Sequence, residues 1–376
     1  QVALIPKQEF DTFVVSQSQM KATIDHNKAV PLYIYYYFSN PSEIEYIKSN
    51  AIQTGVPHTN LSQLKSHEIL LPSLGEQEKI VKMLGSLDEK IELNRQTNQT
   101  LEQMAQALFK SWFVDFDPVI DNALAAGNPI PEELQARAQR RQQQLAKPDH
   151  QPLPDDVRQL FPSEFEETEA LGWVPKGWEV SYIKDLATII KGKSYKSSEL
   201  EESNTALVTL KSFVRGGGYR LDGLKEYTGK YKPEQEVFAG DLVIAYTDVT
   251  QAADVIGKPA MVISDSRYEH LVISLDVAVV RATNDNFKYY LYGLAQTKKF
   301  QEHTLSHSTG TTVLHLNKVA VPEYRFAKPS NEVLELYINS VKPKYQSIDR
   351  HVQNNRVLES LRDTLLPKLI SGELPL

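Results

Sequence analysis

Apolar residues recur at alternating steps of four and three along residues 76–113. This spacing places them on one stripe of a helix that packs against a second helix. Asn94 and Asn98 interrupt the stripe at its centre, and "SLGE" (73–76) has the Ser-x-x-Glu form of a capping box. We therefore predict a long helix over 73–113 with a polar centre. Its stripe consists of Ile80, Leu84, Leu87, Ile91, Asn94, Asn98, Leu101, Ala105, Leu108 and Trp112.

The same spacing returns near the end of the chain, again with polar residues at its centre. If the two helices run antiparallel, Asn94 faces Asn355. In the same register Asn98 faces His351, and sliding by one heptad would place these side chains against leucine. The alternative is a pair of partly hydrated helices whose polar positions face water. The second stripe consists of Tyr337, Val341, Lys344, Ile348, His351, Asn355, Leu358, Arg362, Leu365 and Leu369.

The chain also repeats itself at an offset of 257 residues without a gap over more than fifty positions. This length is too great for a solenoid repeat and indicates two copies of a large unit. The second copy opens near Leu171, so the matching point of the first copy would precede Gln1. We expect the first copy to be truncated at its amino end. Matching pairs include Thr54 with Thr311, His58 with His315, Pro72 with Pro329, Ile91 with Ile348 and Asn98 with Asn355.

Residues 171–328 hold short β-rich runs broken by Gly, Pro and Asp, followed by a helical pattern at 289–303. This mixture predicts an α+β domain with a strongly bent sheet. Residues 114–170 are expected to be a linker with one helix near 131–146. The β-rich runs cover 206–214, 241–246, 260–264 and 270–282.

Composition narrows the chemistry that the chain can perform. There are no cysteines, which excludes disulfides and thiolate metal sites. No apolar run is long enough for a membrane span. "GKS" (192–194) lacks the preceding glycine of a phosphate-binding loop, because Ala187 stands there. The histidines show no metal-binding spacing, and no nucleophile motif is present. We therefore expect no catalytic site, no bound metal and no cofactor.

Charge is unevenly distributed. The chain carries a net charge of −7, but residues 171–328 hold 20 Lys and Arg against 18 Asp and Glu, a net +2. Cations gather in "KGKSYK" (191–196) and in residues 211–232, where "KSFVRGGGYR" adds three glycines. Such a loop suits contacts with phosphates and base edges. The alternative is an ordinary solvated loop.

Together these motifs resemble one family, the specificity (S, HsdS) subunits of Type I restriction–modification systems. The likeness covers nearly the whole chain and follows the order and duplication of the motifs. One departure is that the first target-recognition domain lacks its amino-terminal part. The motifs are "TGVPHTNLSQLKSHEILLPSLGEQEKI" (54–80), "LDEKIELNRQTNQTLEQMAQALFKSWFVDFDPV" (87–119), "LGWVPKGWEV" (171–180), "STGTTVLHLNKVAVPEY" (308–324) and "NNRVLESLRDTLLPKLISGEL" (354–374).

The resemblance implies two target-recognition domains with bent β-sheets, separated by an antiparallel pair of long coiled-coil-like spacer helices in a pseudo-two-fold internal repeat. The expected divisions are the end of the first recognition domain (1–72), the first spacer helix (73–113), the linker (114–170), the second recognition domain (171–328), and the second spacer helix with a C-terminal tail (329–376).

The resemblance also implies a non-catalytic, cytoplasmic host-defence role. Each recognition domain would read one half of a split double-stranded DNA target, and the helices would set the gap between the halves. Two methyltransferase (M) subunits would dock on the helices, and restriction–motor (R) subunits would join them. S-adenosylmethionine, ATP and Mg would be bound by those partner subunits.

DNA contacts are carried over onto four loops of the second recognition domain. The cations are assigned mainly to phosphates, with Arg215 or Arg220 able to hold a guanine by two hydrogen bonds. In the first domain, a structural role for His58 remains an alternative. The candidate DNA-binding residues are Lys191, Lys193, Ser194, Lys211, Ser212, Arg215, Arg220, Tyr246, Thr247, Asp248, Gln251, His307, Ser308 and Thr309, with Thr54 and His58 in the first domain.

Other functions remain possible at this stage. One is the specificity subunit of a related system in which methylation and cleavage share a polypeptide. Another is a coiled-coil scaffold that binds only proteins, against which the basic, glycine-containing loops argue. The third is an autonomous enzyme.

Overall fold

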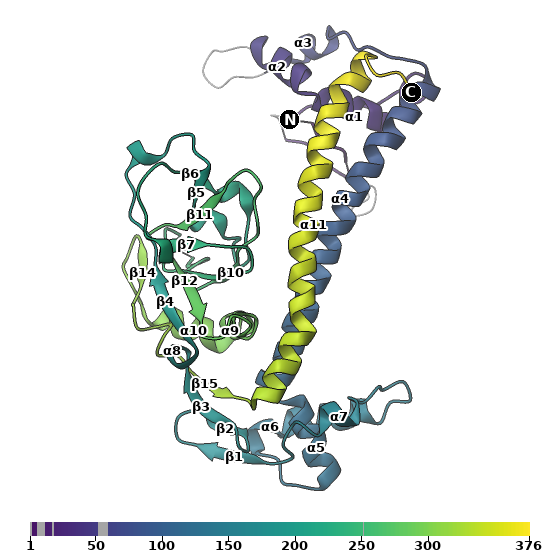
Figure 1. The fold of residues 1–376 in the computed structure, drawn as a ribbon. Coiled ribbons are helices and arrows are strands. Elements are labelled where there is room, and N and C mark those ends of the chain that lie inside the picture. Colours follow the sequence, from purple (N-terminus) through teal and green to yellow (C-terminus); the bar gives the residue numbers. More distant parts are fainter. Residues whose placement is uncertain (1, 6–11, 17–18, 52–58, 251) are drawn as a thin grey trace. The chain divides into compact units, whose positions relative to one another are not determined.

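The computed structural model describes residues 2–5, 12–16, 19–51, 59–250 and 252–376. The chain forms two compact units, one made of Gln1–Thr97 and His351–Leu376 and the other of Asn98–Arg350. Two long helices, α4 (Leu74–Phe109) and α11 (Asn331–Ser371), each contribute a segment to both units (Figure 1). They occupy the two regions whose heptad spacing predicts long helices.

In the first unit, α1 (Pro31–Ser39) packs against the beginning of α4 and the end of α11. The start of α4 is fixed by the expected capping box. The backbone N–H of Ser73 donates to Oε2 of Glu76 at 2.9 Å, and the N–H of Glu76 donates to the Ser73 hydroxyl at 3.4 Å. α2 (Pro41–Ser49) and α3 (Leu61–Lys65) complete the helices, and the described residues of this unit form no strand. The core consists of Tyr33, Tyr36, Tyr37, Ile80, Leu84, Leu366, Leu369 and Ile370.

Within the first unit the two long helices run antiparallel, and the expected contact between Asn94 and Asn355 is present. Nδ2 of Asn94 donates to Oδ1 of Asn355 at 2.7 Å, and Nδ2 of Asn355 donates to the carbonyl of Ile91 at 3.2 Å. Both asparagines are buried. Nearer the amino end of α4, Arg362 donates to Asp88 at 2.8 Å. Buried amides with these bonds favour this register over its neighbours.

Asn98 lies in the second unit, where its Nδ2 donates to the carbonyl of Ile348 at 3.4 Å. His351 belongs to the first unit. The pairing of Asn98 with His351 therefore stays a prediction.

The helices recur along the chain at the spacing of the sequence repeat. α2 and α10 (Lys298–Ser306) lie 257 residues apart at both ends, and α4 and α11 begin 257 residues apart. α1 and α9 (Phe287–Ala295) differ from this spacing by a single residue. The repeated sequence thus forms the same order of helices in both copies.

In the second unit, α9 packs against the end of α4 and the beginning of α11. The ring of Phe109 lies 5.3 Å from that of Tyr290 and 5.6 Å from that of Tyr337, measured between centroids. This close approach depends on Gly293, because a Cβ at that position would lie 2.3 Å from Cδ2 of Phe109. The contact joins α9 to the long helices.

We expect Gly293→Ala to lower the free energy of unfolding of the second unit by about 1–3 kcal/mol, because the added methyl group overpacks the buried ring of Phe109. All three tryptophans, Trp112, Trp173 and Trp178, belong to this unit, so urea denaturation followed by their fluorescence measures it. Adding Phe109→Leu should recover part of the loss. This explanation would be contradicted if Phe109→Leu lowered the free energy of unfolding of the Gly293→Ala variant by as much as it lowers that of the unaltered protein.

The sheets of the second unit are short. One has the order β10-β8-β12-β4 and is antiparallel throughout, and another has the order β6-β5-β11-β7 with β5 and β11 parallel. The mixture of helices and strands agrees with the expected α+β class. The strands are β3 (Glu179–Tyr182), β4 (Ala187–Lys191), β5 (Thr205–Val208), β6 (Lys225–Glu226), β7 (Glu236–Val237), β8 (Leu242–Ala245), β9 (Thr247–Asp248), β10 (Pro259–Met261), β11 (His270–Ile273), β12 (Val277–Ala282), β13 (Ser308–Thr309), β14 (Leu314–Leu316) and β15 (Arg325–Lys328).

The segment between α4 and β3 contains more structure than the single helix expected near 131–146. A π-helical turn, η1 (Lys110–Val114), leads into the hairpin of α5 (Asp117–Ala126) and α6 (Glu132–Leu145). α7 (Asp155–Arg158) and the strand pair β1 (Phe165–Thr168) and β2 (Gly172–Pro175) follow. The remaining short helices are α8 (Ile183–Leu186), η2 (Ser197–Glu199), η3 (Leu210–Ser212), η4 (Leu221–Gly223) and η5 (Pro233–Gln235).

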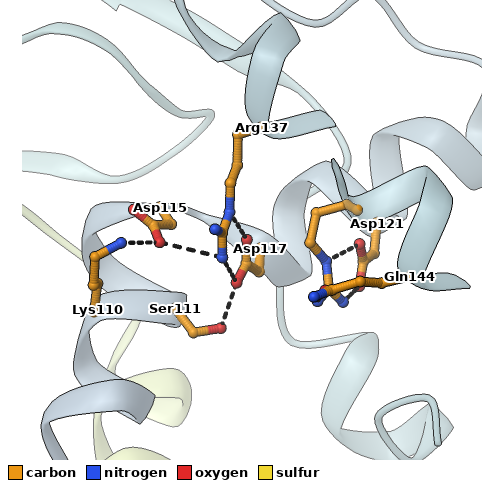
Figure 2. Close-up of polar contacts among 8 residues, drawn as sticks. Lys110, Ser111, Asp115, Asp117, Asp121, Arg137 and Gln144 are labelled. Atoms are coloured by element: carbon orange, nitrogen blue, oxygen red, sulfur yellow. Dashed lines mark hydrogen bonds and ion pairs between the residues drawn. The ribbon is translucent and has the colours of Figure 1, made fainter. Parts of the chain in front are cut away.

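An ion-pair cluster fixes this hairpin to the end of α4 (Figure 2). The Asp117 carboxylate accepts from Nε of Arg137 at 2.7 Å and from its Nη2 at 2.6 Å, and also from the Ser111 hydroxyl at 2.8 Å. Asp115 pairs with Lys110 and lies 3.2 Å from Nη2 of Arg137. These carboxylates hold the pKa of Arg137 above its ordinary value, mainly through the hydrogen bonds of Asp117. We call Lys110, Ser111, Asp115, Asp117 and Arg137 the hairpin ion-pair cluster.

Membrane-spanning helices and metal-binding groups are both absent from the part of the chain that the structure describes. None of its helices has the length and apolar character that a membrane crossing requires. Within the same residues, His, Asp and Glu side chains nowhere gather in a group that could hold a metal ion.

Candidate nucleic-acid interface

Four segments that the sequence singles out meet around Tyr246, the residue after β8. Tyr246 is 2% exposed. Its N–H donates to the carbonyl of Asp276 at 2.8 Å, and its own carbonyl accepts from the N–H of Leu316 at 2.8 Å. Nζ of Lys191 lies 4.9 Å from the centroid of its ring, within the range of a cation–π interaction. Burial raises the pKa of Tyr246. The buried ring of Tyr246 therefore stabilises the Lys191 ammonium group through the cation–π contact and does not itself face solvent.

Lys191 and Lys193 flank a backbone crossing that only glycine permits. A Cβ at Gly192 would lie 2.1 Å from the carbonyl oxygen of Ser274. The N–H of Lys193 donates to the carbonyl of Ile273 at 2.9 Å, which anchors the crossing. "GKS" is thus a strand crossing and not a phosphate cradle. The side chain of Lys191 is exposed and that of Lys193 is half-buried, as phosphate contacts require.

Asp248 organises the loop that follows β9. Its carboxylate is fully buried and accepts hydrogen bonds from Thr250, Val255 and Ile256 at 2.6–3.0 Å. Burial alone would raise the pKa of Asp248, but these hydrogen bonds outweigh it and lower the pKa. Thr247 is also buried, and its hydroxyl donates to Asp276 at 2.8 Å. Both side chains are therefore engaged within the protein as supports of the loop, and the base contacts expected for them stay a prediction.

The glycine-rich loop 211–218 lies beside the Asp248 loop. The N–H of Gly216 donates to the carbonyl of Asp254 at 3.2 Å. Nε of Arg215 lies 3.7 Å from the Asp254 carboxylate, and 82% of the Arg215 side chain is exposed. Gly216, Gly217 and Gly218 all have positive φ, which lets the chain turn back sharply. Arg215 is therefore presented to solvent by a turn held at its base.

The other candidate residues of this segment differ in their exposure to solvent. Lys211 is exposed, but Ser212 is fully buried and its hydroxyl accepts from the N–H of Thr209 at 3.2 Å. Arg220 is exposed and donates to Asp222 through Nε, at 2.6 Å, and through Nη2. That pairing lowers the pKa of Asp222 and occupies the Arg220 guanidinium. Ser212 is thus a positioning residue, and Arg220 is less available to a ligand than Arg215.

The fourth segment joins the same region through the sheet β13-β14-β9. Thr309 pairs with His315, which pairs in turn with Thr247. Thr309 is exposed, whereas the Ser308 hydroxyl donates to the carbonyl of Thr304 at 2.8 Å. Nδ1 of His307 lies 2.8 Å from the carbonyl of His303. This edge therefore offers Thr309 to solvent and uses Ser308 and His307 partly for its own structure.

The exposed candidates are thus a subset of those expected. The residues Thr54, His58 and Gln251 lie outside the described residues. The side chains of Ser212, Tyr246, Thr247 and Asp248 are buried, and the direct contacts expected for them stay a prediction. Exposed or half-buried candidates are Lys191, Lys193, Ser194, Lys211, Arg215, Arg220, His307, Ser308 and Thr309.

Three residues of the interface are not among the expected ones. Thr250 and Asp254 close the Asp248 loop, because the N–H of Asp254 donates to the Thr250 hydroxyl at 3.1 Å, and the Asp254 carbonyl joins this loop to Gly216. Val249 precedes Thr250, and 67% of its surface is exposed. The Asp248-x-Thr250 spacing is a recognised turn signal and could have identified the turn. Nothing local in the sequence indicates that Asp254 reaches Arg215.

The chain is similar to known proteins of one family. The model of the family described as "Type I restriction modification DNA specificity domain" matches residues 1–103 and 175–333. The HindI specificity subunit of Haemophilus influenzae is 29% identical, with 97% of this chain and 82% of that protein covered. The MjaIX specificity subunit of Methanocaldococcus jannaschii is 24% identical, with 93% and 71% covered.

Solved structures give a similar set of names. The S subunit of a Type I restriction–modification system from M. genitalium aligns with a TM-score of 0.48 and 17% identity, covering 92% of this chain and 74% of the other. The HsdS subunit from Thermoanaerobacter tengcongensis aligns with a TM-score of 0.33 and 16% identity, covering 93% and 72%. Because the family model covers well over half of the residues, the chain belongs to the Type I restriction–modification DNA specificity family.

Proposed function

We propose that this chain is the DNA-recognition subunit of a Type I restriction–modification complex and reads a bipartite target. The observation that carries this proposal is the family match in two separate segments, 1–103 and 175–333. The convergence of Lys191, Lys193 and Arg215 at one end of β8 supports it for the second unit, since cations on preformed loops suit phosphates and base edges. The chain acts as a specificity subunit and leaves catalysis to its partners.

The long helices supply the spacer in this proposal. α4 and α11 form an antiparallel, coiled-coil-like strut with a pseudo-two-fold relation between the copies, and its register fixes the gap between half-sites. Support comes from the buried Asn94–Asn355 hydrogen bond and from the recurrence of helices at 257 residues. Because a shift of one heptad would separate the two buried amides, one register is favoured over its neighbours.

The partners follow from the same role. Two methyltransferase subunits dock on the helices, and restriction–motor subunits join them. S-adenosylmethionine, ATP and Mg are held by those subunits. These statements rest on the family and on relatives described as specificity subunits of Type I restriction enzymes.

The proposal is tested by DNA binding of the chain assembled with its methyltransferase subunits. Sequencing of methylated sites in the host genome gives the bipartite target. Titration of a duplex with this target should give specific binding that weakens as salt rises, with a slope of log K against log salt near 0.9 for each phosphate neutralised. Binding that ignores salt, or no preference for the methylated site, would favour the protein-binding scaffold.

The role of the asparagine pair can be separated from its effect on stability. Asn94→Leu or Asn355→Leu alone leaves a buried amide without its partner and should cost about 1–3 kcal/mol in the free energy of unfolding. The double substitution should restore most of that stability but loosen the helix register. Circular dichroism during urea denaturation measures the first effect.

The second effect is measured with targets whose half-sites are moved apart or together by one base pair. The double variant should discriminate less between these spacings than the unaltered chain. A double variant that keeps the same strictness would refute the spacing role of the asparagine pair, while the single variants would still report its contribution to stability.

A further inference from the structure

Val249 is an exposed aliphatic side chain in a loop that is held by hydrogen bonds to a buried carboxylate. The preceding Asp248 is fully buried, and its carboxylate accepts from the N–H groups of Val255 at 2.6 Å and Ile256 at 3.0 Å. These bonds tie the two ends of the loop together. The Thr250 hydroxyl closes it further by donating to Asp248 at 2.7 Å. Val249 is therefore held in place before any ligand arrives, and its use in binding costs little ordering.

The backbone of this loop is also strained. Ala253 has φ of +55°, a conformation that residues with a side chain rarely adopt. Such a residue persists only where the surrounding contacts impose it, and such residues cluster at ligand-binding sites. Hydrogen bonds from Thr250 and Asp254 surround Ala253 in the chain. The described residues on either side of Ala253 are thus held by hydrogen bonds within the protein.

The neighbouring turn holds a cation against Asp254 of the same loop. Asp254 accepts from Gly216 at its carbonyl and lies 3.7 Å from Nε of Arg215 at its carboxylate. Val214, in the same turn as Arg215, is 43% exposed. The end of β8 therefore presents aliphatic surface next to a guanidinium.

This combination selects one kind of nucleic-acid contact. An aliphatic side chain gains nothing from a phosphate, so Val249 has no use on a surface that binds only the DNA backbone. The aliphatic feature of base edges in the major groove is the C5-methyl group of thymine. We propose that Val249 packs against the C5-methyl group of a thymine in the half-site read by the second unit and helps to specify that base pair. This inference rests on the proposed function.

The test uses the full chain assembled with its methyltransferase subunits and duplexes of the target defined by methylation sequencing. Each thymine of the half-site is replaced in turn by deoxyuridine, which differs only by the missing methyl group. The unaltered chain should lose roughly three- to fivefold in affinity at one position, the factor expected for one buried methyl group. The Val249→Ala variant should lose a similar factor in affinity for the unmodified target. Replacing the sensitive thymine by deoxyuridine should then cause no further loss of affinity in this variant.

Phe238→Ala is the matched control. Phe238 is 61% exposed, but it precedes β8 (Leu242–Ala245), whereas Val249 follows it, so the two lie at opposite ends of the strand. This variant should bind like the unaltered chain and keep its sensitivity to deoxyuridine. Tryptophan fluorescence during urea denaturation checks that both variants remain folded.

The outcomes separate the inference from the function beneath it. If the complex shows no specific DNA binding, the proposed function fails and the inference falls with it. If binding is specific but Val249→Ala keeps the full loss at every deoxyuridine, or if the half-site contains no sensitive thymine, only the inference is overturned.

Discussion

Arg137→Ala should lower the free energy of unfolding of the second unit by about 3 kcal/mol, because it leaves the buried Asp117 carboxylate without its cation. Asp117 is 4% exposed, and both of its oxygens accept from the Arg137 guanidinium. The remaining donor, the Ser111 hydroxyl, cannot neutralise the charge. Urea denaturation followed by tryptophan fluorescence measures the change, since Trp112 lies in the turn that the cluster holds.

Arg140→Ala provides the control on the same helix. Arg140 is exposed, and substitutions of exposed surface residues usually change stability by less than about 0.5 kcal/mol. Arg137→Lys should fall between the two, because lysine keeps the charge but cannot form the two parallel bonds. Equal losses for Arg137→Ala and Arg140→Ala would show that the hairpin is held by other contacts, such as the buried side chains of Val119 and Ile120.

The helices were predictable because their signals are local. Residues three and four apart share a helix face whatever lies elsewhere in the chain. The stripe of α4, the capping box at Ser73 and the facing of Asn94 with Asn355 all follow from spacing and register alone. The internal repeat then supplied the second helix independently. These features needed no knowledge of the tertiary structure.

The helix near 131–146 was predicted and is α6, but α5 and its hairpin with α6 were missed for the opposite reason. Its cluster joins Asp117 to Arg137 across twenty residues, and its segment contains no continuous apolar stripe that would mark two packed helices. The burial of some candidate site residues was missed for a related reason. Tyr246 has the composition of an exposed turn, and its backbone is bonded to Asp276 and Leu316, which are distant in sequence.

Charge clusters were thus a sounder guide to exposed positions than polar side chains in general. Lysines and arginines resist full burial unless they are paired, so their positions in sequence already indicate surface. Ser, Thr and Asp serve equally well as internal supports of loops. The structure divides the expected contacts along this line, with Lys191, Lys211 and Arg215 exposed and Ser212, Thr247 and Asp248 buried.

Arg215→Ala should weaken binding of the target duplex by roughly 10- to 100-fold, the range for losing two hydrogen bonds to a guanine. Arg215 is the better candidate for this contact because Arg220 is already bonded to Asp222, whereas Arg215 approaches Asp254 only to 3.7 Å. The loss should be confined to targets with the correct base at one position. Affinity titrations against duplexes altered at each base pair of the half-site measure it.

Two substitutions complete that experiment. Lys191→Ala should weaken the binding of all duplexes alike. It should also lower the magnitude of the slope of log K against log salt by about 0.9, as expected for a phosphate contact. Lys184→Ala should change neither, because Lys184 pairs with Glu323 at 2.8 Å and precedes β4 at the end opposite Lys191. If Arg215→Ala instead weakened every duplex equally and lowered the slope, Arg215 would be a phosphate contact. A larger loss for Arg220→Ala than for Arg215→Ala would reverse their roles, because the bond to Asp222 would then have to open for DNA.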